Sequence, residues 1–218
     1  PISKKSFSTD ISYFTIDSSI QTIKSDISKL LLASVKSSFL VPSSVTKIES
    51  HAFEKCESLA QISFENQSSL IKIESFAFSE CTALKHISIP TSVMEIENSA
   101  FLKCSLLEFV SIPPFLKRIG SFTFSKCWSL KKIIIPPSVT NIGSHAFSEC
   151  SSLEEITIPS SVTSIESFAF SKCESLKQVL FNEPSAIVKI EKNVFLDCSS
   201  LQQIIIPSSV KKIKESAF

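Results

Sequence analysis

Seven cysteines are the residues of this chain whose type and spacing could do chemistry. They recur at intervals of 25, 23, 23, 23, 23 and 25 residues, as Cys56, Cys81, Cys104, Cys127, Cys150, Cys173 and Cys198. Disulfide frameworks use an even number of cysteines at irregular spacings, and zinc sites usually begin with a Cys-x-x-Cys pair, which this sequence lacks. A buried free cysteine behaves as a small apolar residue with a weak S–H donor. The spacing therefore predicts one stacked interior column of thiols.

The three histidines do not form a second chemical site. His51 and His145 share one repeat position four units apart, about 20 Å at ~4.8 Å per strand, which is too far to share a metal. Phenylalanine holds the same position in other repeats, so we predict a partly packed side chain there. The sequence contains no Gly-rich phosphate loop, no Gly-x-Ser-x-Gly elbow and no His-Glu-x-x-His motif. We therefore expect no catalytic, cofactor-binding or metal site, and a protein that is not an enzyme.

Other residue columns keep the period of the cysteines. Leucine follows each cysteine by three residues, phenylalanine precedes each by three, and isoleucine precedes that phenylalanine by five, from Ile48 to Ile213. The phenylalanine column is Phe53, Phe78, Phe101, Phe124, Phe147, Phe170, Phe195 and Phe218. A fixed period of roughly 20–50 residues is typical of a solenoid, in which each repeat packs on the next. We expect the phenylalanines to contact one another in the inner column.

Each repeat reads as one strand and one return segment. In the stretch 153–158 the alternation of apolar and polar residues is that of a half-buried strand, and a proline closes most of the equivalent strands. Strands that recur every 23 residues predict a parallel sheet. The mixed spacings of the return segment, as in 162–173, suit short helical turns or loops. Because the chain has only two glycines, the corners cannot depend on glycine at positive φ. Glutamate and lysine columns beside the isoleucines predict a solvated face with weak ion pairs.

The repeats divide the chain into two parts. Residues 41–218 are an array of units of 23–25 residues, and the last unit stops midway, so we expect a piece of a longer array. Residues 1–40 follow the pattern poorly and are predicted to be a degenerate repeat or an N-terminal cap. Two repeats carry two extra residues, directly after Phe64 and Phe181, and these insertions should bulge at one edge. Leu70 and Ile187 then restore the valine column.

Charge and hydropathy exclude two classes of partner. The net charge is +1, so no global field draws the chain to nucleic acid. No stretch approaches 18 consecutive apolar residues, so we expect no membrane span in this segment. The oligomeric state is left open by the sequence.

The unit Ile-Pro-x-Ser-Val-x-x-Ile-x-x-x-Ala-Phe-x-x-Cys-x-x-Leu, written almost fully in residues 135–153 and 158–176, resembles a leucine-rich repeat of the BspA-like (Treponema pallidum-type) class. The resemblance covers about residues 41–218. It implies an α/β solenoid, a curved right-handed superhelix with a parallel β-sheet on the concave face and short helical turns or loops on the convex face. It also implies a cell-surface or secreted protein associated with adhesion to host proteins, with no catalytic residues and no cofactor.

Strand positions that face away from the core vary from repeat to repeat, and several are apolar. Exposed apolar patches often mark interaction sites, although single β-branched residues also simply suit a strand surface. Trp128 is a further candidate. It directly follows Cys127, at a position that holds Glu, Thr or Ser in the other repeats, and tryptophan is enriched at binding hot spots. The candidate protein-binding residues are His86, Phe109, Trp128, Lys132, Ile134, Glu155, Gln178, Leu180, Gln203 and Ile205.

The leading hypothesis is a non-enzymatic protein-protein interaction module, an adhesin-type surface protein that binds host or extracellular proteins through its concave face. A passive structural stalk is the first alternative, and an intracellular (cytoplasmic) scaffold is the second, because the cysteines are unpaired. Asn66 begins the Asn-Gln-Ser sequon, a possible N-glycosylation site that matters only in a secretory pathway.

Overall fold

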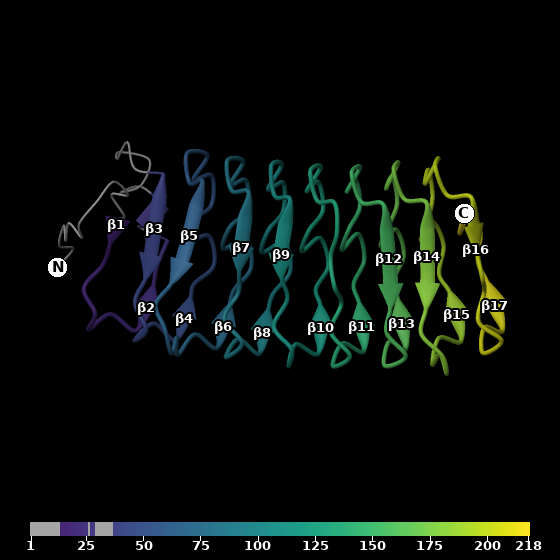
Figure 1. Cartoon of the computed structure of the whole chain (residues 1–218), viewed down its shortest axis with the longest axis horizontal. Helices are drawn as coiled ribbons and strands as arrows, with labels where there is room; N and C mark the ends of the chain where they lie inside the picture. Colours follow the sequence, from purple (N-terminus) through teal and green to yellow (C-terminus); the bar gives the residue numbers. More distant parts are fainter. Residues whose placement is uncertain (1–13, 26, 29–36) are drawn as a thin grey trace.

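The repeats stack along one axis as a parallel β-solenoid of about eight turns (Figure 1). The structure is a computed structural model, and it describes residues 14–25, 27, 28 and 37–218. Neighbouring repeats contribute equivalent strands to common ladders, so that residues one repeat apart in the sequence lie side by side. Phe39, for example, lies between Phe14 and Ile62 in one ladder.

The longer strand of each repeat forms the first ladder, which we call the long-strand sheet. Its strands are β1 (Phe14–Thr15), β3 (Ser38–Val41), β5 (Gln61–Phe64), β7 (His86–Ser88), β9 (Phe109–Ser111), β12 (Glu155–Ile158), β14 (Gln178–Phe181) and β16 (Gln203–Ile204). The strand pairing is in two parts, β1 to β9 and β12 to β16, and the intervening repeat keeps only a parallel bridge from Phe109 to Lys132. The pairing confirms the predicted parallel sheet, because every recorded pair in it is parallel.

A second row of strands, which we call the short-strand sheet, runs along the return segments in three hydrogen-bonded parts, of four, three and two strands. Its two-residue strands are β2 (Thr22–Ile23), β4 (Lys47–Ile48), β6 (Lys72–Ile73), β8 (Glu95–Ile96), β10 (Arg118–Ile119), β11 (Asn141–Ile142), β13 (Ser164–Ile165), β15 (Lys189–Ile190) and β17 (Lys212–Ile213). The isoleucine column predicted from the sequence is the inward side of this sheet. Figure 1 shows these strands as a separate row of arrows.

The prediction of an α/β fold with short helical turns or loops was wrong in its helical alternative, whereas loops are what the return segments contain. Over residues 37–218 the return segments contain turns and two-residue strands but no helix. The physical reason lies in the corners, where two residues per repeat, four positions apart, have positive φ. A helix needs consecutive residues in the right-handed region, and the corner residues interrupt that run.

None of the corner residues with positive φ is a glycine. Among the described residues sixteen non-glycine residues have φ between 48° and 62°, and fifteen of them fall in the two corner columns. The first column is His51, Phe76, Ser99, Phe122, His145, Phe168, Asn193 and Ser216, and the second is Lys55, Glu80, Lys103, Lys126, Glu149, Lys172 and Asp197. This confirms that the corners do not rely on glycine. From Lys55 to Lys172, the N–H groups of the second column donate to the following repeat, as Lys55 does to the carbonyl oxygen of Ser79 at 2.8 Å.

The core is built from the phenylalanine and cysteine columns. From Phe53 to Phe218 each ring stacks on the next, with centroids 5.0–5.7 Å apart. Each cysteine from Cys81 onward donates its S–H to the phenylalanine carbonyl oxygen of the preceding repeat, at 3.1–3.3 Å. The predicted inner columns are therefore confirmed. Each thiol is a second donor to a carbonyl oxygen that already accepts the backbone N–H of the cysteine in its own repeat, as the Phe53 oxygen does from Cys56 at 3.1 Å.

Thiol accessibility gives a first testable prediction. Six cysteines are buried and Cys198 is partly exposed, and desolvation raises the pKa of the Cys56 and Cys104 thiols to about 12. Because a thiol reacts as its thiolate, these buried groups stay protonated and unreactive even at pH 9. We expect a thiol reagent to label one cysteine in the native chain, Cys198, and all seven in denaturant. Peptide mass spectrometry locates the label, and rapid native labelling of a second cysteine would contradict the buried column.

Both insertions and part of the N-terminal region can be placed. Leu70 and Ile187 are buried as predicted, and the inserted residues after Phe64 are exposed. Residues 14–25 continue the array in register, since Ile23 pairs with Ile48. The predicted degenerate repeat or cap at 1–40 otherwise lies largely outside the described residues, so its assignment stays a prediction.

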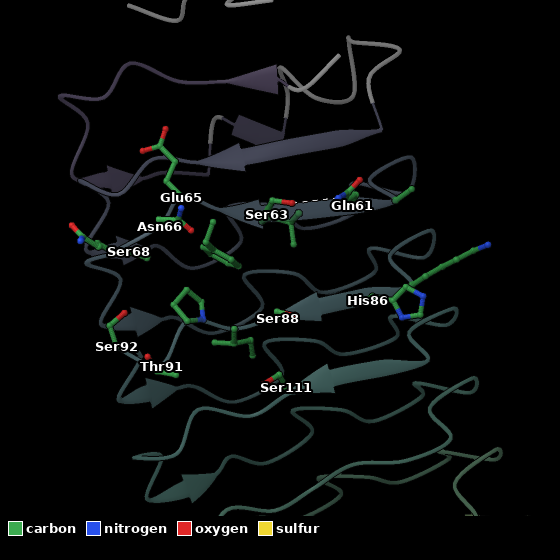
Figure 2. A pocket seen from close by; sticks show the side chains of 17 residues that line it. Gln61, Ser63, Glu65, Asn66, Ser68, His86, Ser88, Thr91, Ser92 and Ser111 are labelled. Atoms are coloured by element: carbon green, nitrogen blue, oxygen red, sulfur yellow. Dashed lines mark hydrogen bonds between the residues drawn. The ribbon is translucent and has the colours of Figure 1, made fainter. Parts of the chain in front are cut away.

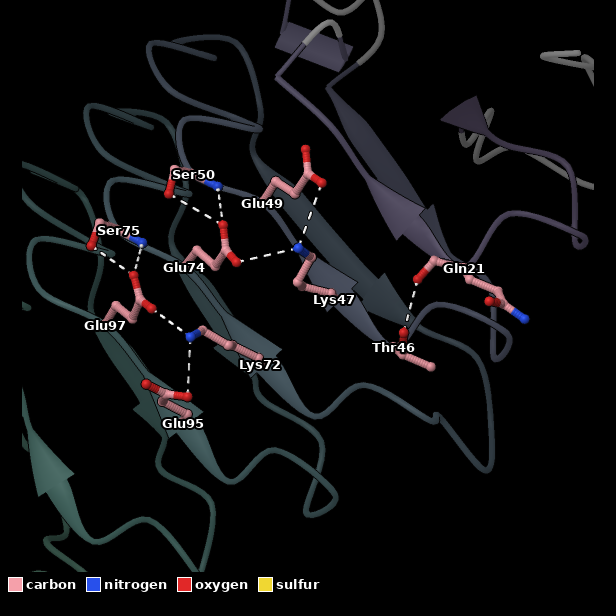
Figure 3. A network of polar contacts seen from close by, with 10 residues as sticks. All are labelled: Gln21, Thr46, Lys47, Glu49, Ser50, Lys72, Glu74, Ser75, Glu95 and Glu97. Atoms are coloured by element: carbon pink, nitrogen blue, oxygen red, sulfur yellow. Dashed lines mark hydrogen bonds and ion pairs between the residues drawn. The ribbon is translucent and has the colours of Figure 1, made fainter.

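Glutamates beside the short-strand sheet bind the backbone of the preceding repeat (Figure 3). The Glu97 carboxylate accepts hydrogen bonds from the backbone N–H and the hydroxyl of Ser75, at 3.0 and 2.8 Å, and it pairs with Lys72 at 2.6 Å. Partial burial acts to raise the pKa of Glu97, but the hydrogen bonds from Lys72 and Ser75 outweigh it and lower that pKa. This column therefore does more than solvate a face with weak ion pairs, because it caps backbone groups between repeats.

The two glycines belong to this same column. Gly143 lies where other repeats have glutamate, and a Cβ atom there would lie 2.6 Å from the Ser121 nitrogen. The Ser121 N–H instead donates to the Asn98 side-chain oxygen at 2.8 Å. The glycines thus permit close approach of adjacent repeats, and an asparagine replaces the missing carboxylate.

Candidate functional site

The outward face of the long-strand sheet carries nine of the ten residues predicted to bind a partner. All nine side chains are exposed, and their inward neighbours Val110, Ile133, Ile156 and Val179 are buried. The alternation arises because successive residues of a strand point to opposite faces. The structure therefore places the predicted set on one face, in two rows that run along the solenoid.

The first row passes through six consecutive repeats. Strand pairing sets His86 beside Phe109 and Gln178 between Glu155 and Gln203. Lys132 connects the two halves, since it bridges to Phe109 through the backbone and pairs with Glu155 through its ammonium group at 3.3 Å. We call this set, His86, Phe109, Lys132, Glu155, Gln178 and Gln203, the mixed row.

The second row is apolar in the C-terminal half of the array. Ile134 is 69% exposed and Ile205 is 73% exposed, and Leu180 pairs with Thr157 between them. We call Ile134, Leu180 and Ile205 the apolar row. Large aliphatic side chains with this exposure keep most of their apolar surface in water after folding. They therefore add little to the stability of the core.

A row of charges borders the mixed row at the entry to each strand. Glu108 pairs with Lys131 at 2.9 Å, and Glu154 pairs with Lys177 at 2.8 Å. The hydrogen bond from each lysine lowers the pKa of its glutamate partner. Since exposed ion pairs contribute little to stability, these charges are free to exchange their partners for those of another protein.

Trp128 lies outside both rows. It is exposed, as predicted, on the turn between the cysteine and the strand position of its repeat, and its carbonyl oxygen accepts the N–H of Ser152 at 3.1 Å. Leu106 on the equivalent turn of the preceding repeat and Phe115 on the turn between β9 and β10 are also exposed apolar residues, at 46% and 60%. Sequence reasoning did not select these two, although Phe115 breaks a column of serines and could have been found by that departure.

A polar groove on the same face was also missed. It has a volume of about 850 Å³ and lies over β5, β7 and β9, bordered by the insertion that follows β5 (Figure 2). Its floor carries Ser63, Ser88 and Ser111 at one strand position, and Ser88 pairs in register with Ser111. Later repeats carry Ile134, Thr157, Leu180 and Ile205 at that position. The serines could have been noticed as a run of three small polar residues in a column that is otherwise apolar except for Thr157.

The histidines take part in ring stacking on the corners. His145 stacks between Phe122 and Phe168, with both centroids 4.6 Å away, and His51 stacks on Phe76 at 5.1 Å. Partial burial lowers the pKa of His145. The prediction of a partly packed side chain at this position is confirmed for both histidines.

Within the described residues no three histidine, cysteine or acidic side chains come together as a possible metal site. Nor does any helix in that part of the chain have the length and apolar character that crossing a bilayer requires.

Comparison with known proteins gives one family and several solved structures. The profile of the BspA type leucine rich repeat region matches residues 34–145 and 117–218, in six copies. A leucine-rich repeat protein of T. pallidum is 31% identical, with a TM-score of 0.68, covering 78% of this chain and 79% of that one.

A leucine-rich cell surface protein of Faecalibacterium prausnitzii is 26% identical, with a TM-score of 0.52, covering 84% and 70% of the two chains. A leucine-rich repeat protein of Eubacterium ventriosum shows the fold alone, at 23% identity and a TM-score of 0.67 over 84% of this chain and 58% of that one. No curated protein matches the sequence.

Proposed function

The chain belongs to the family of BspA-type leucine-rich repeat proteins, and from this premise we propose that it is a non-enzymatic module that binds another protein through the outward face of the long-strand sheet. In this proposal the array is a curved right-handed superhelix, and the long-strand sheet forms its concave side. Because fold likeness alone does not establish a binding role, the support for one must come from the side chains of that face.

The observation that carries the proposal is the contrast between the two faces of the same strands. Inward positions repeat isoleucine and valine, whereas outward positions combine the mixed row with the apolar row. Ile134, Leu180 and Ile205 expose 69%, 41% and 73% of their surface. Ile134 shares a repeat with Lys132, and Leu180 lies on the strand next to that of Glu155, the ion-pair partner of Lys132. Apolar side chains bordered by charges are typical of surfaces that bind protein.

A surface or secreted location is the second part of the proposal. The relative from F. prausnitzii is described as a cell surface protein, and this supports a surface location for the present chain, which the proposed adhesin-type role requires. A passive stalk and an intracellular scaffold remain the alternatives. Asn66 is exposed in the insertion after β5, and it stays a predicted N-glycosylation site. A glycan found on Asn66 by mass spectrometry of the native protein would exclude the intracellular scaffold.

The test is binding of the purified chain to a panel of purified extracellular-matrix proteins, measured by surface plasmon resonance. A fourfold variant replaces Phe109→Ser, Lys132→Glu, Ile134→Ser and Glu155→Lys in adjacent repeats. Interface hot spots contribute about 2 kcal/mol or more each, so we expect this variant to bind at least about tenfold more weakly than the natural chain, which corresponds to ~1.4 kcal/mol. Its thermal unfolding should be little changed because all four side chains are exposed.

A matched control removes the same kind of surface elsewhere. Ile71 and Met94 are exposed to 51% and 59% and precede β6 and β8 in the short-strand sheet. The double variant Ile71→Ser with Met94→Ser should keep full binding. Equal binding by the fourfold variant and the natural chain would remove the site from this face, and no binding to any member of the panel would favour the stalk.

A further inference from the structure

We propose that the groove over β5, β7 and β9 binds a short neutral oligosaccharide, at a site separate from the proposed protein-binding rows apart from His86 at its rim. The groove has a volume of about 850 Å³, within the range of roughly 300–1,000 Å³ that small-molecule sites occupy. The proposal goes beyond protein binding, because it assigns a second class of ligand to another part of the sheet.

The shape of the groove follows from three small side chains between larger ones. Ser63, Ser88 and Ser111 occupy one outward column, in which Leu40 precedes them and Ile134 follows them. The missing side-chain volume leaves a trough across three strands, and neighbouring strands lie about 4.8 Å apart. The hydroxyl groups therefore form a floor with a regular spacing along the solenoid axis.

The insertion after β5 closes one end of this trough. Figure 2 shows Glu65, Asn66 and Ser68 beyond the end of β5, with Thr91 and Ser92 on the adjacent repeat, whereas Gln61 and His86 lie at the opposite end. Glu65 is held in place because its carboxylate accepts the backbone N–H of Ser43 at 2.9 Å. The groove is thus bordered by polar side chains at both ends.

The polar groups of the groove are available to a ligand. Within the described part of the chain, no side-chain hydrogen bond is recorded for Asn66, His86, Ser88, Thr91 or Ser111. Serine and threonine hydroxyls both donate and accept, and the asparagine amide does the same. A sugar ring presents hydroxyl groups that also donate and accept, so each of these side chains can find a partner on it.

Apolar side chains in the same groove favour a pyranose over a purely polar ligand. Phe64 and Pro90 contribute to the lining beside the hydroxyl groups. A pyranose has C–H groups on the faces of its ring and hydroxyl groups around its edge, and it matches this combination. A neutral sugar is favoured over a charged one because the charges of the lining balance. The lining carries one carboxylate, Glu65, and one ammonium group, Lys85.

An extended peptide fits the groove less well. The peptide groups of β5, β7 and β9 already pair with their neighbours in the ladder, so a peptide cannot join this sheet as an added strand. Only side chains of the groove remain to bind it.

The experiment titrates the purified chain with cellotetraose, maltotetraose, mannotetraose and chitotetraose, using isothermal calorimetry and NMR shifts of the backbone amides. We expect at least one sugar to bind and to shift the amides of β5, β7 and β9. The variant Ser88→Ile fills the floor with a side chain that the same column already carries at Ile134. It should weaken binding by about tenfold or more, since it blocks the trough and removes a hydrogen bond.

Two further variants keep the result decisive. Thr157→Ile changes the same column three repeats later, outside the groove, and should bind the sugar like the natural chain. If Ser88→Ile does not fold, the exposed double variant Asn66→Ala with Thr91→Ala replaces it, with an expected loss of about threefold or more. The proposal is overturned if no sugar binds, if the floor and rim variants bind normally, or if a neutral Gly-Ser-Asn peptide binds in place of every sugar.

Discussion

Replacing Phe124 by alanine is expected to lower the free energy of unfolding by about 3–5 kcal/mol, the range for a phenylalanine removed from a packed core. The ring is 1% exposed, and it stacks on Phe101 and Phe147 with both centroids at 5.5 Å. In a repeat array, stability depends on each interface between neighbours. The substitution removes ring contacts from two of these interfaces at once.

The measurement is urea unfolding of the natural chain and the variant, followed by far-UV circular dichroism and by the fluorescence of Trp128. Trp128 is the only tryptophan and lies four residues from the substitution, so it reports on the affected repeat. Phe115→Ala is the control, because Phe115 lies on the turn between β9 and β10 and is 60% exposed. Its effect should stay within about 0.5 kcal/mol, as for most surface substitutions. Equal losses for the two variants would contradict the stacked column.

The inner columns could be predicted because every repeat presents the same evidence. Phe124 and Cys127 fall in register with their equivalents in all the other full repeats, and the only arrangement that buries such columns is a stack. Some hydrogen bond donated by each thiol could be expected, because a buried S–H group is a weak donor. Its acceptor, the phenylalanine carbonyl oxygen of the preceding repeat, became visible only in three dimensions.

The short-strand sheet could not be predicted from the periodicity. Its strands have two residues, as in Lys72–Ile73, and an alternation of two residues cannot be distinguished from a turn. The role of Glu97 was missed for a related reason. Its partner Ser75 lies 22 residues away in the sequence, and only the register between repeats sets the carboxylate against that N–H group.

On the outward face, too, features that follow from the repeat pattern could be predicted, and features that depend on contacts between repeats could not. The exposure of Phe109, Lys132 and Ile134 follows directly from strand alternation. The groove does not, because Ser88 and Ser111 read singly as ordinary polar strand residues. Their significance comes from lying side by side next to the insertion after β5.

The corners lead to the second large expected effect, the loss of stability on replacing Lys172 by proline. Lys172 has φ of 58°, and its N–H donates to the carbonyl oxygen of Leu196 at 2.7 Å. Proline fixes φ near −65° and has no N–H, so both the corner conformation and the bond to the next repeat are lost. We expect a cost of about 3 kcal/mol or more, measured by urea unfolding.

Replacing Lys172 by glycine should have the opposite effect on stability from replacing it by proline. An L-residue in the left-handed region costs roughly 1–2 kcal/mol, which glycine avoids, and its extra chain entropy costs about 0.5–1 kcal/mol. Lys172 makes no recorded ion pair within the described residues, so Lys172→Gly should leave stability unchanged or raise it by up to about 1 kcal/mol. Lys85 is also exposed, but it is not among the residues with positive φ. Lys85→Gly should therefore lower stability, and a loss of the same size in both glycine variants would show that the corner residues are not strained.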